Sequence, residues 1–346
     1  MEYKYVSLTL PSSACFSNIE YLKLKNIEVV DEGFFKWISS TCKSIKKLQL
    51  EEIQGIKHLS IESSSLQSFS FVHRLQLDPF HLSISADNLE DLVINWGFCG
   101  CQKLNIFAPE VRYMKWTGIL LIHQNFGEFK LLEQAELYLR PGGNDFLSEF
   151  LSSICKVKAL IMKEDTVNIV NALSEKGSMP APLDNVRQLQ LHVGYFCDHL
   201  VPVMVSLLKG LPNLSTLNIN TDPVEYCPRT NSSGYNEAYW KLLNLSFVNK
   251  LEEVSIELPN GSNGVELAWY ILDYAQSLKK MVIVHSPEQS HFKRKLLKRK
   301  KISNVRVVFQ EDQRRGLQSK LEEEYCQIKD NYDFPTPEML LEKVLK

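Results

Sequence analysis

One pattern of apolar and polar positions recurs along the chain as far as residue 283. An apolar residue is followed by two mostly polar residues, and then by an apolar, a variable and an apolar residue, as in Leu214-Ser-Thr-Leu-Asn-Ile219. The ten copies occupy residues 19–24, 45–50, 66–71, 89–94, 111–116, 157–162, 186–191, 214–219, 251–256 and 278–283. A pattern repeated ten times predicts a fold built from stacked, similar units.

The second half of each copy predicts a short β-strand, because its apolar residues alternate with the position between them. Both apolar side chains then point into the core and the middle side chain points outward. Stacking the units places the strands side by side in a parallel sheet over a continuous apolar column. The pattern is the L-x-x-L-x-L core of a leucine-rich repeat, so we expect an α/β fold, a solenoid with this sheet on its concave face.

The spacing of the copies predicts a change of architecture along the chain. Copies between residues 45 and 111 begin 21 to 23 residues apart, whereas the copies at 157, 186 and 214, and those at 251 and 278, begin 27 to 29 residues apart. The short units leave room only for a second strand on the convex face, for which residues 56–61 and 102–106 are candidates. The long units leave room for helices with apolar residues at i, i+3 and i+4. We expect helices over residues 146–154, 167–173, 200–208 and 265–275.

Two local details accompany these expectations. Asn263 and Glu266 form a pair typical of a capping box at the start of the last helix. Residues 131–139 belong to a further repeat unit, but their apolar residues allow two strand frames that differ by two residues.

Composition suggests three segments. Residues 221–239 are rich in Pro, Asn, Ser and Gly and interrupt the repeat, which is typical of a loop or boundary. After residue 310 the pattern stops, and the remainder is charged and carries Pro335 and Pro337. We therefore predict a repeat array over residues 1–225, C-terminal repeats over 226–310 and a mobile tail over 311–346.

Charge and motifs exclude several function classes. The net charge of -2 indicates no dominant nucleic-acid field. We expect no signal peptide and no membrane span, and we therefore expect the eight cysteines to be reduced in the cytoplasm or nucleus. Cys99 and Cys101 form a pair, yet no second Cys or His pair follows at metal-finger spacing, and His81 and His123 lie far apart. We expect no metal, no cofactor and no catalytic residue, and hence no enzyme.

Three stretches, residues 108–118, 251–283 and 292–309, resemble parts of the plant F-box/leucine-rich-repeat proteins that end in an FBD domain. Residues 108–118 (APEVRYMKWTG) look like a repeat unit of that family. Residues 251–283 are similar to the core of the FBD domain, and residues 292–309 look like its end. The resemblance implies a module that recognises a protein target for ubiquitination. The F-box, which binds the Skp-type adaptor of the ligase, has no counterpart in this sequence, so adaptor binding is expected only if an F-box is supplied.

The middle residue of each predicted strand is a candidate for contact with the protein target, because curved repeat surfaces commonly bind partners through such rows. These residues are Lys23, Gln49, Ser70, Val93, Lys115, Ile161, Gln190, Asn218, Ser255 and Val282. They mix polar and apolar side chains with only two charges, which suits a protein or peptide better than a phosphate backbone. A free-standing scaffold, and a sensor of a small ligand or peptide, remain alternatives.

A basic run is the second candidate feature. Seven cations occupy nine positions, namely Lys293, Arg294, Lys295, Lys298, Arg299, Lys300 and Lys301. The run is a candidate nuclear-import signal or, as a less favoured alternative, a nucleic-acid contact. The competing interpretation is the solvated face of a short helix that Phe292, Leu296 and Leu297 anchor.

Overall fold

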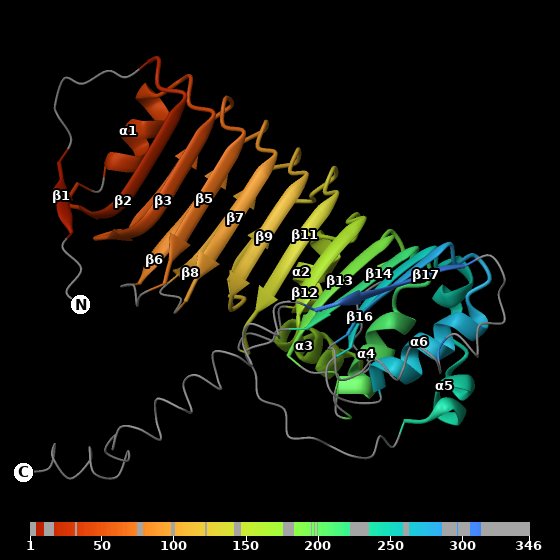
Figure 1. The fold of residues 1–346 in the computed structure, drawn as a ribbon. Helices are drawn as coiled ribbons and strands as arrows, with labels where there is room; N and C mark the ends of the chain where they lie inside the picture. The colour runs from red at the N-terminus through yellow and green to blue at the C-terminus, as the bar shows by residue number, and fades with distance from the viewer. Residues whose placement is uncertain are drawn as a thin grey trace, which may run out of the picture.

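The computed structural model describes most of the chain as two β-sheets and six α-helices (Figure 1). The residues described are 5–9, 17–31, 33–74, 79–97, 101–121, 123–141, 147–175, 183–194, 196, 198, 200–221, 235–258, 263–285, 296 and 305–312. The segments 293–295 and 297–301, which contain the cations of the basic run, lie outside them. So does 313–346, which is the predicted tail without its first two residues.

The larger sheet contains thirteen parallel strands in the order β1-β2-β3-β5-β7-β9-β11-β12-β13-β14-β15-β16-β17. Their bounds are β1 (Val6–Leu8), β2 (Tyr21–Val29), β3 (Lys47–Gln54), β5 (Ser68–His73), β7 (Asp91–Trp96), β9 (Tyr113–Gly118), β11 (Gln134–Leu139), β12 (Ala159–Lys163), β13 (Gln188–Val193), β14 (Thr216–Thr221), β15 (Glu253–Leu258), β16 (Lys280–His285) and β17 (Arg306–Glu311). The strands follow one another across the sheet in the order of the sequence. This confirms the expected α/β class with a large parallel sheet.

A repeated backbone contact holds neighbouring strands in the same register. The carbonyl of Glu20 accepts hydrogen bonds from the amides of Lys46, at 2.8 Å, and Lys47, at 2.9 Å. The same paired acceptance recurs at the carbonyls of Lys46, Gln67, Glu90, Arg112, Glu133, Lys158, Arg187, Ser215 and Glu252. Each acceptor is the residue that follows the first apolar position of a unit. The contact therefore sets the position of each strand from β3 to β16 in this sheet relative to the one before it.

The smaller sheet accompanies the first half of the larger one and has the order β10-β8-β6-β4. It comprises β4 (His58–Glu62), β6 (Phe80–Ser85), β8 (Cys101–Phe107) and β10 (Gln124–Phe126). The expected second strands at 56–61 and 102–106 correspond to β4 and β8. The sequence analysis missed β6 and β10, although Phe80, Leu82 and Ile84 alternate with polar residues in the way a strand requires.

Helices accompany mainly the second half of the large sheet (Figure 1). The four expected helices correspond to α2 (Leu147–Ser153), α3 (Glu164–Glu175), α4 (Leu200–Lys209) and α6 (Asn263–Tyr274). Three further helical segments were not predicted, namely α1 (Phe34–Thr41), α5 (Glu237–Leu243) and the 3-10 turn η2 (Ser246–Lys250). In the part of the chain that the structure describes, no helix is long and apolar enough to cross a membrane.

The side chain of Asn263 links the start of the last helix to an earlier part of the chain. Asn263 is the first residue inside α6 and is buried. Its side-chain amide donates to the backbone carbonyl of Phe196 at 3.1 Å and to Oδ1 of Asp198 at 2.8 Å. Asn263 thus ties α6 to the chain segment before α4, because a buried amide must find partners wherever they are.

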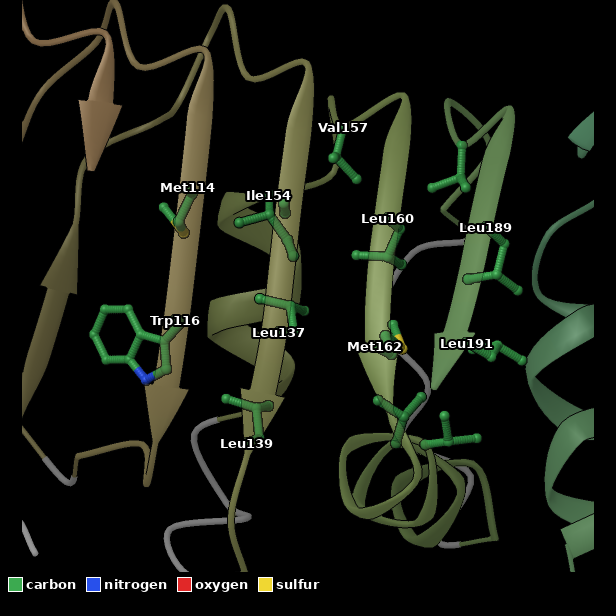
Figure 2. Close-up of a cluster of buried hydrophobic side chains, with 14 of the residues drawn as sticks. Met114, Trp116, Leu137, Leu139, Ile154, Val157, Leu160, Met162, Leu189 and Leu191 are labelled. Carbon is green, nitrogen blue, oxygen red and sulfur yellow. The ribbon is translucent and has the colours of Figure 1, made fainter. Parts of the chain in front are cut away.

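The inward face of the large sheet packs on the small sheet and on the helices. Figure 2 shows the inward side chains of four consecutive strands, with Trp116, Leu137, Met162 and Leu191 in one row. The ring centroid of Trp116 lies 5.5 Å from that of Phe126 in β10 and 5.5 Å from that of Phe150 in α2. The small sheet and the first of these helices thus contact the same core side chain.

Gly118 occupies a position at which no larger side chain fits. It ends β9 with a φ of 122°, a conformation that L-residues rarely adopt. A Cβ atom there would lie 2.3 Å from the backbone oxygen of Trp96. Glycine at this position therefore allows β9 to pass close to β7, and the Trp96 and Trp116 rings pack edge to face with centroids 5.1 Å apart.

Candidate functional site on the open face of the large sheet

The face of the large sheet opposite the core, which we call the open face, carries the outward side chains. All ten candidate residues lie on it in one continuous row. Strand pairing places Lys23 beside Gln49, Gln49 beside Ser70, and so on to Ser255 beside Val282. The structure adds Glu136 between Lys115 and Ile161, and Val308 beyond Val282. We call these twelve residues the central row.

Side chains of the central row are accessible. Lys23 is exposed, and the other eleven are partly buried by their neighbours on either side. From β3 to β16 the residues that flank the members of the row are almost completely buried, as Leu217 and Ile219 are on either side of Asn218. The predicted strand frames are therefore correct, and the open face presents side chains that the core does not use.

A compact polar cluster occupies the middle of the open face. The hydroxyl of Tyr113 donates to Oε1 of Glu136 at 2.9 Å. The Lys115 ammonium lies 2.8 Å from Oε2 of Glu136, and the hydroxyl of Tyr138 donates to the same oxygen at 3.3 Å. The ring of Tyr138 lies between two cations, with Nζ of Lys115 at 5.1 Å and Nζ of Lys163 at 5.4 Å from its centroid. We call these five residues the central cluster.

Mutual hydrogen bonding sets the charge state of the central cluster. Burial alone would raise the pKa of Glu136, but hydrogen bonds from Lys115 and Tyr113 outweigh burial, and the pKa lies below its ordinary value. The pKa of Tyr138 rises to about 12, first through burial and then through the negative charge of Glu136. Burial and the Glu136 carboxylate also raise the pKa of Tyr113. At neutral pH the cluster therefore contains an ionised Glu136 and two neutral tyrosines.

Sequence reasoning missed Glu136 because the frame of residues 131–139 was ambiguous. The structure pairs Ala135 with Met114 and Leu137 with Trp116, so Glu136 is the outward residue between them. The unit's first apolar position is Leu132, which is buried, while Leu131 is partly exposed. The small side chain of Ala135 weakened the apolar pattern. The alternation of Ala135, Leu137 and Leu139 was the signal that identifies the correct frame.

Towards β2 the open face carries a second, more exposed network. The hydroxyl of Tyr21 donates to Oε1 of Gln49 at 2.7 Å. The carboxylate of Glu51 lies 2.7 Å from Nζ of Lys23 and 3.0 Å from Nζ of Lys25. Hydrogen bonds from these two lysines lower the pKa of Glu51. Because Lys23 and Lys25 are largely exposed, solvent screens these ion pairs and they contribute little to folding stability.

Beyond the central cluster the open face becomes rich in uncharged amides. Ile161 is followed along the central row by Gln190 and Asn218. Nε2 of Gln190 lies 2.8 Å from Nε2 of His192, and Asn220 follows His192 on the next strand. Amide side chains both donate and accept hydrogen bonds, so this stretch can hydrogen-bond to uncharged polar groups of a partner.

The structure describes only one residue each of the basic run and of the cysteine pair. Leu296 is the one described residue of the basic run, and it is buried, as expected if the run is anchored by apolar residues. Within the described ranges no group of three or more His, Cys, Asp or Glu residues is placed to hold a metal. Cys101 is buried and without a disulfide, and Cys99 lies outside the described residues.

Two pockets lie away from the open face, at the turns that precede the strands. One, of about 440 Å³, is lined by polar side chains that include Glu20, Lys46 and Glu90. The other, of about 320 Å³, is lined by serines together with Lys43, Glu62 and Asp87. Both are open and polar, unlike the largely apolar and enclosed pockets that bind most small molecules.

Neither a scan against protein-family models nor a search of curated proteins finds a match for this chain.

Proposed function

We propose that the chain is a leucine-rich-repeat solenoid whose open face binds a protein target. The observation that carries the proposal is the central row, in which twelve outward side chains from consecutive parallel strands form one accessible surface. The lengths of the repeat units and the paired backbone hydrogen bonds between them support the solenoid interpretation. Stacked repeats typically bind partners through an extended surface of this kind.

The composition of the open face supports a protein as the partner. Lys115 is neutralised by Glu136, and Lys23 by Glu51, at 2.8 and 2.7 Å. A phosphate backbone would require a surplus of cations that are free to contact it. Tyrosines held by hydrogen bonds, as Tyr113 and Tyr138 are, supply rigid amphipathic contact area, which protein interfaces favour.

The resemblance to F-box/leucine-rich-repeat proteins with an FBD domain supports a more specific role. We infer target recognition in the manner of a ubiquitin-ligase substrate receptor, in the cytoplasm or nucleus. Binding to a Skp-type adaptor is proposed only for a chain that also carries an F-box. On this proposal the open face holds the target and performs no chemistry on it.

Site-specific photocrosslinking tests the use of the open face. A benzophenone side chain introduced at Asn218 on the open face should capture a discrete partner in cells. The same side chain introduced at Lys103, an exposed residue of β8 in the small sheet, is the matched control. Adducts of the same identity and yield from both positions would contradict the proposal, because the interaction would then have no preference for the open face.

A further inference from the structure

Lys163 is the cation of the central cluster that has no carboxylate partner among the described residues. Both carboxylate oxygens of Glu136 are already engaged, one by Tyr113 and the other by Lys115 and Tyr138. The Lys163 ammonium lies 5.4 Å from the centroid of the Tyr138 ring, and its side chain is exposed. Among the described residues, no carboxylate lies within ion-pair distance of Lys163. The cluster therefore presents one available cation beside a fixed aromatic ring.

Lys163 pairs in register with His192, and an apolar and an amide side chain lie two residues earlier on the same two strands. Ile161 lies two residues before Lys163 on the same strand and is partly exposed. Gln190 pairs in register with Ile161, and Asn218 pairs with Gln190. A peptide group has one donor and one acceptor, and a primary amide side chain can satisfy both. Neighbouring parallel strands place such amides about 4.8 Å apart, so an extended main chain that lies across the strands can contact both.

We propose that this part of the open face binds an extended peptide segment that carries an aspartate or glutamate. The acidic side chain pairs with Lys163, and the amides of Gln190 and Asn218 hydrogen-bond to the peptide main chain. The inference rests on the proposed function and names the chemistry of the partner. One available cation suits a single carboxylate, whereas a nucleic acid would require several cations along its backbone.

Selection from a random peptide library tests the inference. A phage-displayed library of linear peptides is panned on the purified chain, and the selected peptides are synthesised and measured by fluorescence anisotropy. We expect enrichment of Asp or Glu at one fixed position. Replacing that residue by Asn or Gln should weaken binding about tenfold or more, because charge-assisted hydrogen bonds are the strong ones.

Charge reversal supplies the sharper arm. In a Lys163→Glu variant, the selected position should change its preference to Lys or Arg. The matched control is Lys103→Glu, which makes the same charge change at an exposed residue of the small sheet and should leave selection unchanged. Gln190→Ala should weaken every selected peptide, whatever its charge. Both lysine variants should melt within a few degrees of the wild type, because exposed side chains contribute little to folding stability.

The outcomes separate this inference from the function on which it rests. If the selected peptides crosslink to the open face but show no preference for Asp or Glu, the inference of an acidic peptide is wrong and the proposed target recognition still stands. The same conclusion follows if the preference survives Lys163→Glu. A 12-nucleotide single-stranded RNA that binds more tightly than every selected peptide, with dependence on Lys163, would also overturn it. If crosslinks from Asn218 and Lys103 are indistinguishable, the proposed function itself fails.

Discussion

Alanine substitutions at Leu217 and at its neighbour Asn218 compare a core position with an open-face position of the same strand. Leu217 lies in β14 and is completely buried, and strand pairing places it between Leu189 of β13 and Val254 of β15. Asn218 points outward, and its side chain forms no hydrogen bond with another described residue. Both substitutions to alanine leave the backbone free to keep its strand conformation. Only the first removes material from the core.

The expected magnitudes differ several-fold. Leu217→Ala removes buried methyl and methylene groups, and the neighbouring strands hold the space open, because each is fixed by its own backbone contacts. We expect a loss of about 2–5 kcal/mol in the free energy of unfolding. Asn218→Ala should change it by less than about 0.5 kcal/mol, as is usual for outward side chains without partners.

Urea denaturation measured by tryptophan fluorescence and by far-UV circular dichroism provides the assay. Stacked repeats can unfold in parts, so the two signals must coincide before a single free energy is extracted. A shift of the midpoint with an unchanged slope then reports stability alone. Equal losses for Leu217→Ala and Asn218→Ala would refute the strand frame, and with it the position of the whole central row.

Three further predictions address acidity and localisation. Glu136→Gln should lower the melting temperature at pH 7 and should lower it less at pH 3. The pKa of Glu136 is lowered in the folded state, so the contribution of its charge is fully present above about pH 4.5 and is lost progressively as the pH falls. Burial lowers the pKa of His73, although the negative charge of Glu52 opposes this effect. The unfolded chain therefore binds the proton more readily than the folded chain does. Below about pH 6.5 the stability of the wild type should decline more steeply than that of His73→Leu, by at most about 1.4 kcal/mol per pH unit. Parallel slopes in thermal melts from pH 7 to 5 would contradict this. Changing the four cations of residues 298–301 to Gln should move a tagged protein out of the nucleus with an unchanged melting temperature, whereas an unchanged distribution would exclude an import signal.

The parallel sheet could be predicted from the sequence because each strand has its own local signal. In a strand such as β14, Leu217 and Ile219 are buried on either side of Asn218, and this alternation can be read without knowing which strand lies next to it. Ten such signals predicted ten strands and ten members of the central row. The prediction weakened where an apolar position was small, as at Ala135.

The central cluster could not be predicted in this way. Most of its contacts join residues more than twenty positions apart, such as Tyr113 and Glu136. They depend on the relative register of two strands, which the paired backbone hydrogen bonds fix only in the folded chain.

The helix over residues 34–41 could not be predicted for a different reason. Helix α1 contains eight residues, fewer than propensity alone can stabilise, and it packs against β4, so its helical conformation depends on tertiary contacts.

The length of the open face limits how much of it one partner can use. Twelve strands at a spacing of about 4.8 Å extend over roughly 50 Å. A standard interface covers about 800 Å² on each partner, which corresponds to a patch roughly 30 Å across. The network around Glu51 and the valine-rich end at Val282 and Val308 therefore lie too far apart to serve a single compact partner equally. The central cluster and the amide-rich stretch beside it, from β9 to β14, fit within one such patch. For this reason substitutions there should affect binding most, while substitutions at Lys23 or Val308 should leave it nearly unchanged.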